Sequence, residues 1–354
     1  MAEFLQNSDH TQSLSQDHGS PQKTLQDTPR QQQSMSIGLT GATGFVGAAL
    51  ADLLLEQGHH LSVLVRNPAR LHRREGVRVV EGDLSDPQVL QNFVQGQDHI
   101  IHCAGLTHAR RNEEFYEVNV DGARQLAEVF ADQCGDANDG TDGENKFIHI
   151  SSLAARQPEI STYARSKFQS EQAIIDGLSG RAKHIILRAP AMFGPRDTAT
   201  LPFFKAVKNG LAPVPASKSP TRASILFVDD FARAVLTALY HAPADKLYEV
   251  GDNQPDGHSW DEIAYACATA QKVKARTLSL PHSVLWAYAA STSALIRATG
   301  RSPMVTPEKI AEFFHPDWAA RENLLKDATD WHPKIPLKEG FARTALWYQQ
   351  QGLL

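Results

Sequence analysis

The sequence has few of the residues that build disulfide frameworks or metal centres. Its three cysteines, Cys103, Cys134 and Cys267, are far apart in the chain, and its 15 histidines form no HExxH pattern. Neither a set of disulfides nor a bound metal is therefore expected. This use of cysteine fits a reducing, cytoplasmic environment best.

An excess of positive charge is also absent. The 354 residues include 35 Lys and Arg against 40 Asp and Glu, which gives a formal net charge of -5. This balance argues against a general nucleic-acid binder, because it requires no basic face. Hydrophobic residues make up 42% of the chain and charged residues 21%, as in an ordinary soluble enzyme with one large core or two smaller ones.

The first 34 residues lack the aliphatic side chains that a packed core needs. They are rich in Gln, Ser and Asp, so we expect a disordered tail. They also lack the apolar segment of a signal peptide. Met35 directly precedes the first predicted strand, which leaves an alternative translation start open.

Residues 278–298 are apolar but are a poor match to a membrane-spanning helix. Pro281, His282 and a Ser-Thr-Ser run interrupt them. Trp286 and Tyr288, together with Arg297, would suit peripheral contact with a membrane surface. A helix packed on the substrate pocket is the interpretation we favour.

Strand and helix patterns alternate through the first half of the chain. The predicted strands are residues 36–40, 61–65, 77–81, 99–103, 146–150 and 184–187, and the predicted helices are 45–57, 86–94, 112–133 and 161–178. This alternation predicts an α/β fold with a parallel sheet covered on both faces. Ligands bind such sheets at the carboxyl ends of the strands.

A glycine-rich turn follows the first predicted strand. Gly41 permits the tight turn, Gly44 lets the backbone approach a pyrophosphate, and Gly47 lets the following helix pack closely. The helix N-terminus would face the phosphate charge. The turn therefore predicts a dinucleotide site.

Arg66 lies at the end of the second predicted strand, where NAD-binding folds usually carry an acidic residue. A guanidinium suits the 2'-phosphate of NADP. NADP is therefore the expected cofactor, and NAD remains possible if Arg66 and Arg70 are solvated surface charges. Asp83, after the third strand, could accept a hydrogen bond from the adenine amino group, or it could cap a helix.

Tyr163 and Lys167 are separated by one helical turn, with Ser151 and Ser152 just upstream. Of the seven tyrosines, only Tyr163 has a lysine four residues on. Such a pair can move a proton beside a nicotinamide. The ordinary tyrosine pKa of ~10 would have to fall by ~3 for work near neutrality, and the charge of Lys167 favours the phenolate.

At these residues the chain resembles the extended short-chain dehydrogenase/reductase family. The resemblance covers about residues 36–350 and includes the segments TGATGFVG, GDL, HCAG, VNVDGARQL, ISS, YARSK, LRAPAMFGP and FVDD. It implies a Rossmann-like, doubly wound nucleotide-binding domain over 35–190, to which some later segments return. It also implies a smaller substrate-binding region, mainly 191–354, and often a homodimer.

The resemblance also implies a role for matching side chains. Tyr163 would be the general acid/base on the substrate oxygen, Lys167 would bond the nicotinamide ribose, and Ser152 would orient the substrate oxygen. Asn119 would support the backbone near the cofactor. Motifs and resemblance together give these cofactor-binding positions: Gly41, Thr43, Gly44, Phe45, Val46, Gly47, Arg66, Asp83, Leu84, Cys103, Ala104, Gly105, Asn119, Tyr163, Lys167, Ala189 and Pro190.

Two departures favour one branch of this family. Nucleotide-sugar epimerases and dehydratases usually have an asparagine where this chain has Ala191, and an Arg-Asp pair where it has Ala223 and Ser224. Arg222 is one place away, so an adjusted version is conceivable. The sequence looks more like the 3β-hydroxysteroid dehydrogenase and dihydroflavonol reductase branch, whose substrates are hydrophobic.

The expected function is hydride transfer between NADP(H) and a hydrophobic secondary alcohol or ketone. The first alternative is a redox-neutral nucleotide-sugar epimerase or dehydratase with tightly bound NAD. The second is a non-catalytic nucleotide-binding subunit, against which the complete Ser152, Tyr163 and Lys167 set argues.

Overall fold

The computed structural model describes residues 34–72, 75–135, 145–217 and 221–354. The tail predicted over residues 1–34 lies outside these ranges, except for Ser34.

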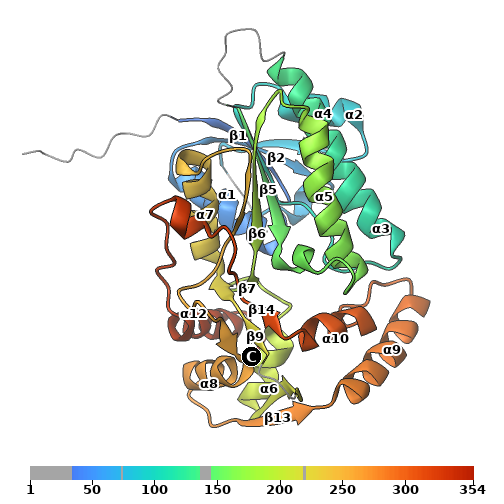
Figure 1. The fold of residues 1–354 in the computed structure, drawn as a ribbon, viewed down its shortest axis with the longest axis vertical. Helices are drawn as coiled ribbons and strands as arrows, with labels where there is room; N and C mark the ends of the chain where they lie inside the picture. The colour runs from blue at the N-terminus through green and yellow to red at the C-terminus, as the bar shows by residue number, and fades with distance from the viewer. Residues whose placement is uncertain (1–33, 73–74, 136–144, 218–220) are drawn as a thin grey trace, which may run out of the picture. The chain divides into compact units, whose positions relative to one another are not determined.

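A seven-stranded parallel sheet forms the centre of the described chain, with the strand order β11-β6-β5-β4-β1-β2-β3 (Figure 1). Its strands are β1 (Ser36–Thr40), β2 (His60–Val65), β3 (Arg78–Glu81), β4 (His99–His102), β5 (Lys146–Ser152), β6 (Lys183–Ala189) and β11 (Lys246–Glu249). The sheet confirms the predicted Rossmann-like α/β fold. Because β11 comes from beyond residue 190, one later segment does return to the sheet. The boundary placed at residue 190 stays a prediction.

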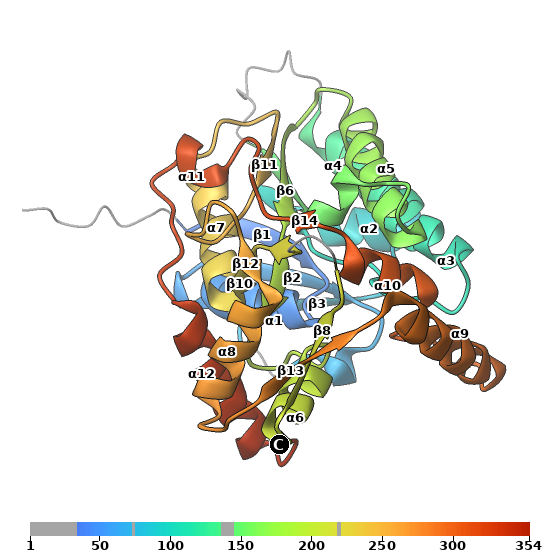
Figure 2. The ribbon, with the colours of Figure 1, turned by 60° about the horizontal axis from the view of Figure 1, so that its bottom comes forward.

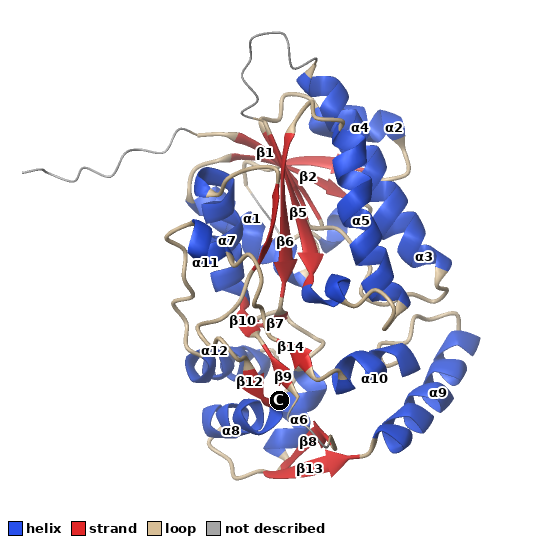
Figure 3. Cartoon of the chain, in the orientation of Figure 1, coloured by secondary structure: helices blue, strands red, loops and turns tan. Residues whose placement is uncertain are grey.

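Helices cover both faces of the sheet, as Figure 3 shows. On one face, α1 (Phe45–Glu56) and α7 (Val228–His241) pack on the strands. On the other face lie α2 (Pro87–Val94), α4 (Gly122–Cys134) and α5 (Thr162–Leu178). Both interfaces are aliphatic and aromatic, so burial of apolar surface holds the three layers together.

The helix predicted over residues 112–133 is divided into three parts. A short α3 (Glu113–Tyr116) and a π-helical segment, Glu117–Asp121, precede α4. Segments of this kind insert an extra residue into a helix and often occur at functional sites. The insertion leaves the apolar periodicity on either side intact, so the sequence pattern did not reveal it.

A smaller region follows β6 and has its own core. Its short strands are β7 (Ala191–Phe193), β8 (Leu211–Pro215), β9 (Arg222–Ala223), β10 (Ile225–Phe227), β12 (His258–Ser259), β13 (Arg276–Leu280) and β14 (Asp317–Trp318). Its helices are α6 (Leu201–Lys208), α8 (Trp260–Ala270), α9 (His282–Ala298), α10 (Pro307–Phe314) and α12 (Leu337–Gln350). The short helix α11 (Leu325–Ala328) packs instead against the core that surrounds the sheet. Aromatic residues such as Phe204, Phe341 and Tyr348 fill the core. Ser259 and Glu262 form a capping box at the start of α8.

The apolar stretch 278–298 is divided between two elements. Its first residues belong to β13, and the helix begins only at His282, after Pro281. α9 lies at the edge of the molecule beside α10 in both ribbon views (Figures 1 and 2). Within the described residues, no helix is both long enough and apolar enough to cross a membrane.

Candidate active site

A cavity of about 380 Å³ lies at the carboxyl ends of β1, β2 and β4. Loops that bind ligands gather at this edge of a parallel sheet. Nine predicted cofactor-binding residues line it: Gly41, Thr43, Gly44, Arg66, Asp83, Leu84, Cys103, Ala104 and Gly105. The cavity therefore brings together motifs from four separate segments of the chain.

The glycine-rich turn connects β1 to α1 at the floor of this cavity. Gly41 has a φ of 80°, which only glycine adopts readily. The amide of Gly44 donates to the carbonyl of Gly41 at 2.9 Å. A Cβ on Gly47 would lie 2.1 Å from the oxygen of Gly41, so the turn and helix touch there. Gly44 supplies no side-chain cap to α1, which leaves the first amides of the helix available to an anion.

Arg66 and Arg70 line the cavity beyond the end of β2. Among the described residues, neither guanidinium has an ion-pair partner in this chain. Asp83 lies on the same wall and accepts from the amide and hydroxyl of Ser85, at 3.1 and 2.9 Å. The N-cap of α2 is Asp86 instead. The helix-cap alternative for Asp83 is therefore wrong, because the N-cap lies three residues further on and the helix begins at Pro87.

Asn119 supports the backbone that follows β4. Its side chain bonds both backbone groups of Leu106, accepting from the amide at 2.7 Å and donating to the carbonyl at 3.1 Å. It also donates to the hydroxyl of Ser166 on α5 at 2.9 Å. This amide therefore ties the cavity loop to the helix that carries Tyr163, as its expected role requires.

Tyr163 lies in the first turn of α5. The hydroxyl of Ser161 caps this helix by accepting from the amide of Ala164 at 3.0 Å. Ser152, the last residue of β5, faces the phenol of Tyr163, and hydrogen bonding between the two acts to lower the pKa of that phenol. Ser151 points elsewhere and donates to Glu171 at 2.6 Å. The geometry thus brings Ser152, and not Ser151, to the tyrosine.

Lys167 is buried one turn further along α5. Its ammonium donates to the carbonyl of Ile150 at 2.7 Å and lies 3.5 Å from Nε2 of His149. Burial lowers the pKa of Lys167 to about 8. Burial also holds the pKa of His149 well below its ordinary value, so this imidazole is neutral. At pH 7 most Lys167 side chains still carry their charge.

The pKa of Tyr163 differs from the one expected. Burial raises it to about 12, against the hydrogen bond from Ser152, and the carboxylate of Glu312 raises it further. The expected fall toward neutrality is not present, because removal from water disfavours the phenolate. Tyr163 is therefore a protonated phenol at neutral pH, which suits it to donate a proton.

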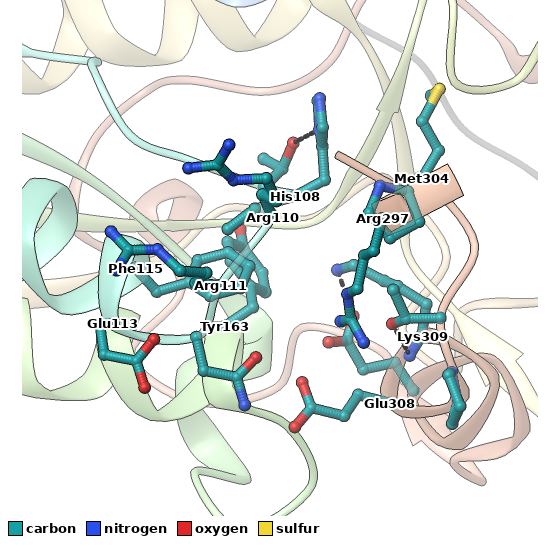
Figure 4. A pocket seen from close by; sticks show the side chains of 17 residues that line it. His108, Arg110, Arg111, Glu113, Phe115, Tyr163, Arg297, Met304, Glu308 and Lys309 are labelled. Atoms are coloured by element: carbon teal, nitrogen blue, oxygen red, sulfur yellow. Dashed lines mark hydrogen bonds and ion pairs between the residues drawn. The ribbon is translucent and has the colours of Figure 1, made fainter. Parts of the chain in front are cut away.

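A second cavity, of about 460 Å³, has Tyr163 on its wall. The loop 107–113 lines one side, and Arg297, Met304 and the start of α10 line the other, as Figure 4 shows. We call the first cavity the nucleotide cavity, because the predicted cofactor-binding residues line it. His108 lines both cavities, so the two are adjacent.

The polar residues of this cavity were not predicted from the sequence. Arg110 and Arg111 both pair with Glu114, and Lys309 pairs with Glu312 at 2.7 Å. Arg297 has no ion-pair partner among the residues that the structure describes. The cations come from two regions almost 200 residues apart and belong to no local motif.

Helix α10 is attached to the start of α5 by its carboxylates. Glu308 accepts from the amide and hydroxyl of Thr162 at 3.2 and 2.9 Å, and Glu312 accepts from the hydroxyl of Ser161 at 2.5 Å. The ammonium of Lys309 lies 4.2 Å from the centre of the Tyr163 ring. The smaller region that follows β6 therefore contacts the predicted catalytic tyrosine directly.

The remaining predicted residues support the cavities without lining either one. Phe45, Val46 and Gly47 form the first turn of α1. Ala189 ends β6, in register with Ser152, and Pro190 follows it. Asn119, Ser152 and Lys167 act from behind the walls, through the contacts given above.

The fold and both cavities fit a dinucleotide-dependent enzyme, and comparison with known proteins places the chain in a family. It belongs to the NAD dependent epimerase/dehydratase family, whose model matches residues 37–251. This confirms the expected resemblance, and members of this family are NAD-dependent.

Individual relatives match nearly the whole chain. It is 35% identical to a ceramide reductase of Caulobacter vibrioides over 321 residues, which cover 90% of this chain and 96% of the relative. It is 23% identical to a UDP-glucose 4-epimerase of Vibrio cholerae, over 89% of this chain and 96% of that protein. The solved structure of gox2253 has the same fold, with a TM-score of 0.70 and 24% identity over 91% of this chain and 100% of that one.

Proposed function

We propose that this protein is an NADPH-dependent reductase that converts a ketone on a long-chain amide lipid into a secondary alcohol. The observation that carries the proposal is the position of Tyr163, on the wall of a cavity beside the nucleotide cavity and one helical turn from the buried Lys167. Burial also keeps this phenol protonated at neutral pH. A protonated donor suits reduction, in which the substrate oxygen must gain a proton.

The residues divide the work of the reaction. NADPH, when bound at the nucleotide cavity, would supply the hydride that the carbonyl carbon gains. Tyr163 gives its phenolic proton to the oxygen, so that the C=O bond becomes C–H and O–H. Ser152, through its bond to the phenol, holds the tyrosine toward the oxygen. The charge of Lys167, one helical turn away, stabilises the phenolate that remains until a proton from solvent restores it.

Arg66 and Arg70 support NADPH over NADH. Both lie beyond the end of the second strand, where dinucleotide-binding folds hold the adenosine ribose. Both lack an ion-pair partner among the described residues. A 2'-phosphate would supply one, through bidentate charged hydrogen bonds.

The lining of the second cavity supports a substrate with a polar region around its ketone. Arg110, Arg111 and Lys309 offer donors near Tyr163, while Phe115 and Met304 offer apolar surface. A ceramide oxidised at its secondary hydroxyl has such a region, with an amide and a second hydroxyl near the carbonyl. The 35% identity to a ceramide reductase supports this substrate class.

The test uses the purified protein, NADPH and a keto-ceramide in detergent micelles, with loss of NADPH and formation of the alcohol measured together. We expect turnover with NADPH, and a loss of at least ~100-fold in Tyr163→Phe. Arg110→Gln with Arg111→Gln is the comparison for substrate binding, and it should raise KM more than it lowers kcat. Absence of turnover, with one NAD released per denatured chain, would contradict the proposal and favour the redox-neutral epimerase alternative.

A further inference from the structure

Large apolar side chains are exposed along α9. Leu295 is 71% exposed, Tyr288 60%, Val284 55% and Trp286 48%. The only buried residues of this 17-residue helix are Ala289 and Ser293. A helix that buries so little of itself gains little from packing in this chain, and its apolar surface calls for another partner.

Three of these exposed residues form one face of the helix. Val284, Tyr288 and Leu295 follow one another at spacings of four and seven, which place them on the same side. The opposite side carries Ala289 and Ser293, and the hydroxyl of Ser293 donates to the carbonyl of Val305 at 2.8 Å. This opposite side meets α10 and the loop before it, so the apolar face points away from the protein. We name Val284, Tyr288 and Leu295 the docking face; Trp286 is also exposed but lies about 200° around the helix from Val284.

The stretch of sequence that contains α9 carries charge of one sign. Residues 263–307 contain no Asp or Glu and five Lys or Arg, in a chain whose net charge is -5. In the sequence these cations precede and follow the helix: Lys272, Lys274 and Arg276 come before α9, and Arg297 and Arg301 lie at its end. Apolar side chains with Trp and Tyr, flanked by cations, are the composition of helices that lie in the headgroup layer of a membrane.

The C-terminal end of α9 borders the cavity of Tyr163. Arg297, in the last turn of α9, and Met304, in the loop that follows, both line that cavity. Helix α10, which packs beside α9, holds the start of α5 through Glu308 and Glu312. Figures 1 and 2 show α9 as the outermost helix on this side, next to α10. A surface that contacted α9 would therefore lie beside the wall of the cavity.

We infer that the docking face binds the surface of an anionic phospholipid bilayer and holds the cavity of Tyr163 against it. The apolar face enters the boundary between headgroups and acyl chains, while the flanking Lys and Arg contact phosphate groups. A lipid ketone can then enter the cavity without crossing water; this last step rests on the proposed function, whereas the docking does not.

The experiment is sedimentation of the full-length protein with vesicles, without cofactor or substrate. Vesicles of phosphatidylcholine with phosphatidylglycerol are compared with vesicles of phosphatidylcholine alone. We expect at least tenfold stronger binding to the anionic vesicles, weakened by added salt. Tyr288→Ser combined with Leu295→Ser should weaken binding at least tenfold.

A matched control is Tyr265→Ser, because Tyr265 on α8 is 76% exposed and lies outside the docking face. This variant should bind vesicles like the unchanged protein, and thermal melting checks that all variants fold. Equal binding by the double variant, or no binding to anionic vesicles, would overturn the inference. So would a soluble oligomer that the double variant dissociates, since a second copy would then cover the face. Failure here leaves the reductase proposal standing, because the assay involves no turnover.

Discussion

Replacing Gly47 with alanine tests the geometry of the glycine-rich turn without any substrate. The added Cβ would lie 2.1 Å from the oxygen of Gly41 and 2.6 Å from its carbon. Ordinary contact begins near 3.4 Å, so turn and helix must separate by about 1.3 Å. Overpacking of this kind costs ~1–3 kcal/mol. We expect a cost at the upper end of this range, because the added Cβ meets backbone atoms, which cannot rotate away as a side chain can. The separation also displaces the amides of Gly44 and Phe45 from the nucleotide cavity.

We therefore expect Gly47→Ala to lower Tm by about 5 °C or more and to weaken NADPH binding at least tenfold. The assays are thermal denaturation and calorimetric titration with NADPH. Gly58→Ala is the matched control: Gly58 follows the other end of α1 with a φ of 80° and nothing within 4 Å of the added Cβ. It should lose only ~1 kcal/mol to backbone strain and bind NADPH normally. Equal Tm and affinity in the two variants would refute the close contact between turn and helix.

Three further predictions follow from single side chains. Arg66→Asp should weaken NADPH binding by about 10- to 100-fold and leave NADH binding nearly unchanged; equal losses in calorimetry would contradict a 2'-phosphate role. The rate of reduction should fall as pH rises through about 8, because Lys167 loses its charge there. Lys167→Arg should move that fall to higher pH. A pH-rate profile that stays flat to pH 10 would exclude a role for the charge of Lys167 in the reaction. The buried Glu171 holds the partly buried Arg188 by two bonds of 2.9 and 2.8 Å. Glu171→Gln should therefore cost ~3 kcal/mol of stability in urea denaturation, whereas an unchanged midpoint would show that this pair contributes nothing.

Most of the candidate nucleotide site could be predicted from the spacing of residues along the sequence. The glycines must fall at fixed intervals between a strand and a helix, and Tyr163 and Lys167 must lie one turn apart, so each pattern is visible within a few residues of sequence. The parallel sheet then brings the separate patterns to one edge. Asn119 could be placed in the same way, although the π-helical segment that holds it could not.

The second cavity could not be predicted, for a physical reason. Its cations come from the loop near Arg110 and from α9 and α10, and only the tertiary fold brings these segments together. The pKa of Tyr163 was wrongly expected to fall, because residue spacing shows the nearby lysine but not the burial. The sequence likewise does not show how much of α9 is buried, and for this reason the helix was expected to pack on the substrate pocket. It contributes Arg297 to the cavity but leaves most of its apolar surface exposed.

The most direct test of the reductase is the path of one hydrogen atom. NADPH deuterated at C4 of the nicotinamide, on the transferred side, is incubated with the keto-ceramide, and the product is analysed by mass spectrometry. We predict an alcohol with deuterium on the carbinol carbon, formed in step with loss of NADPH and almost absent with Tyr163→Phe. A product without deuterium, or tightly bound NAD that is never consumed, would contradict net reduction by this site.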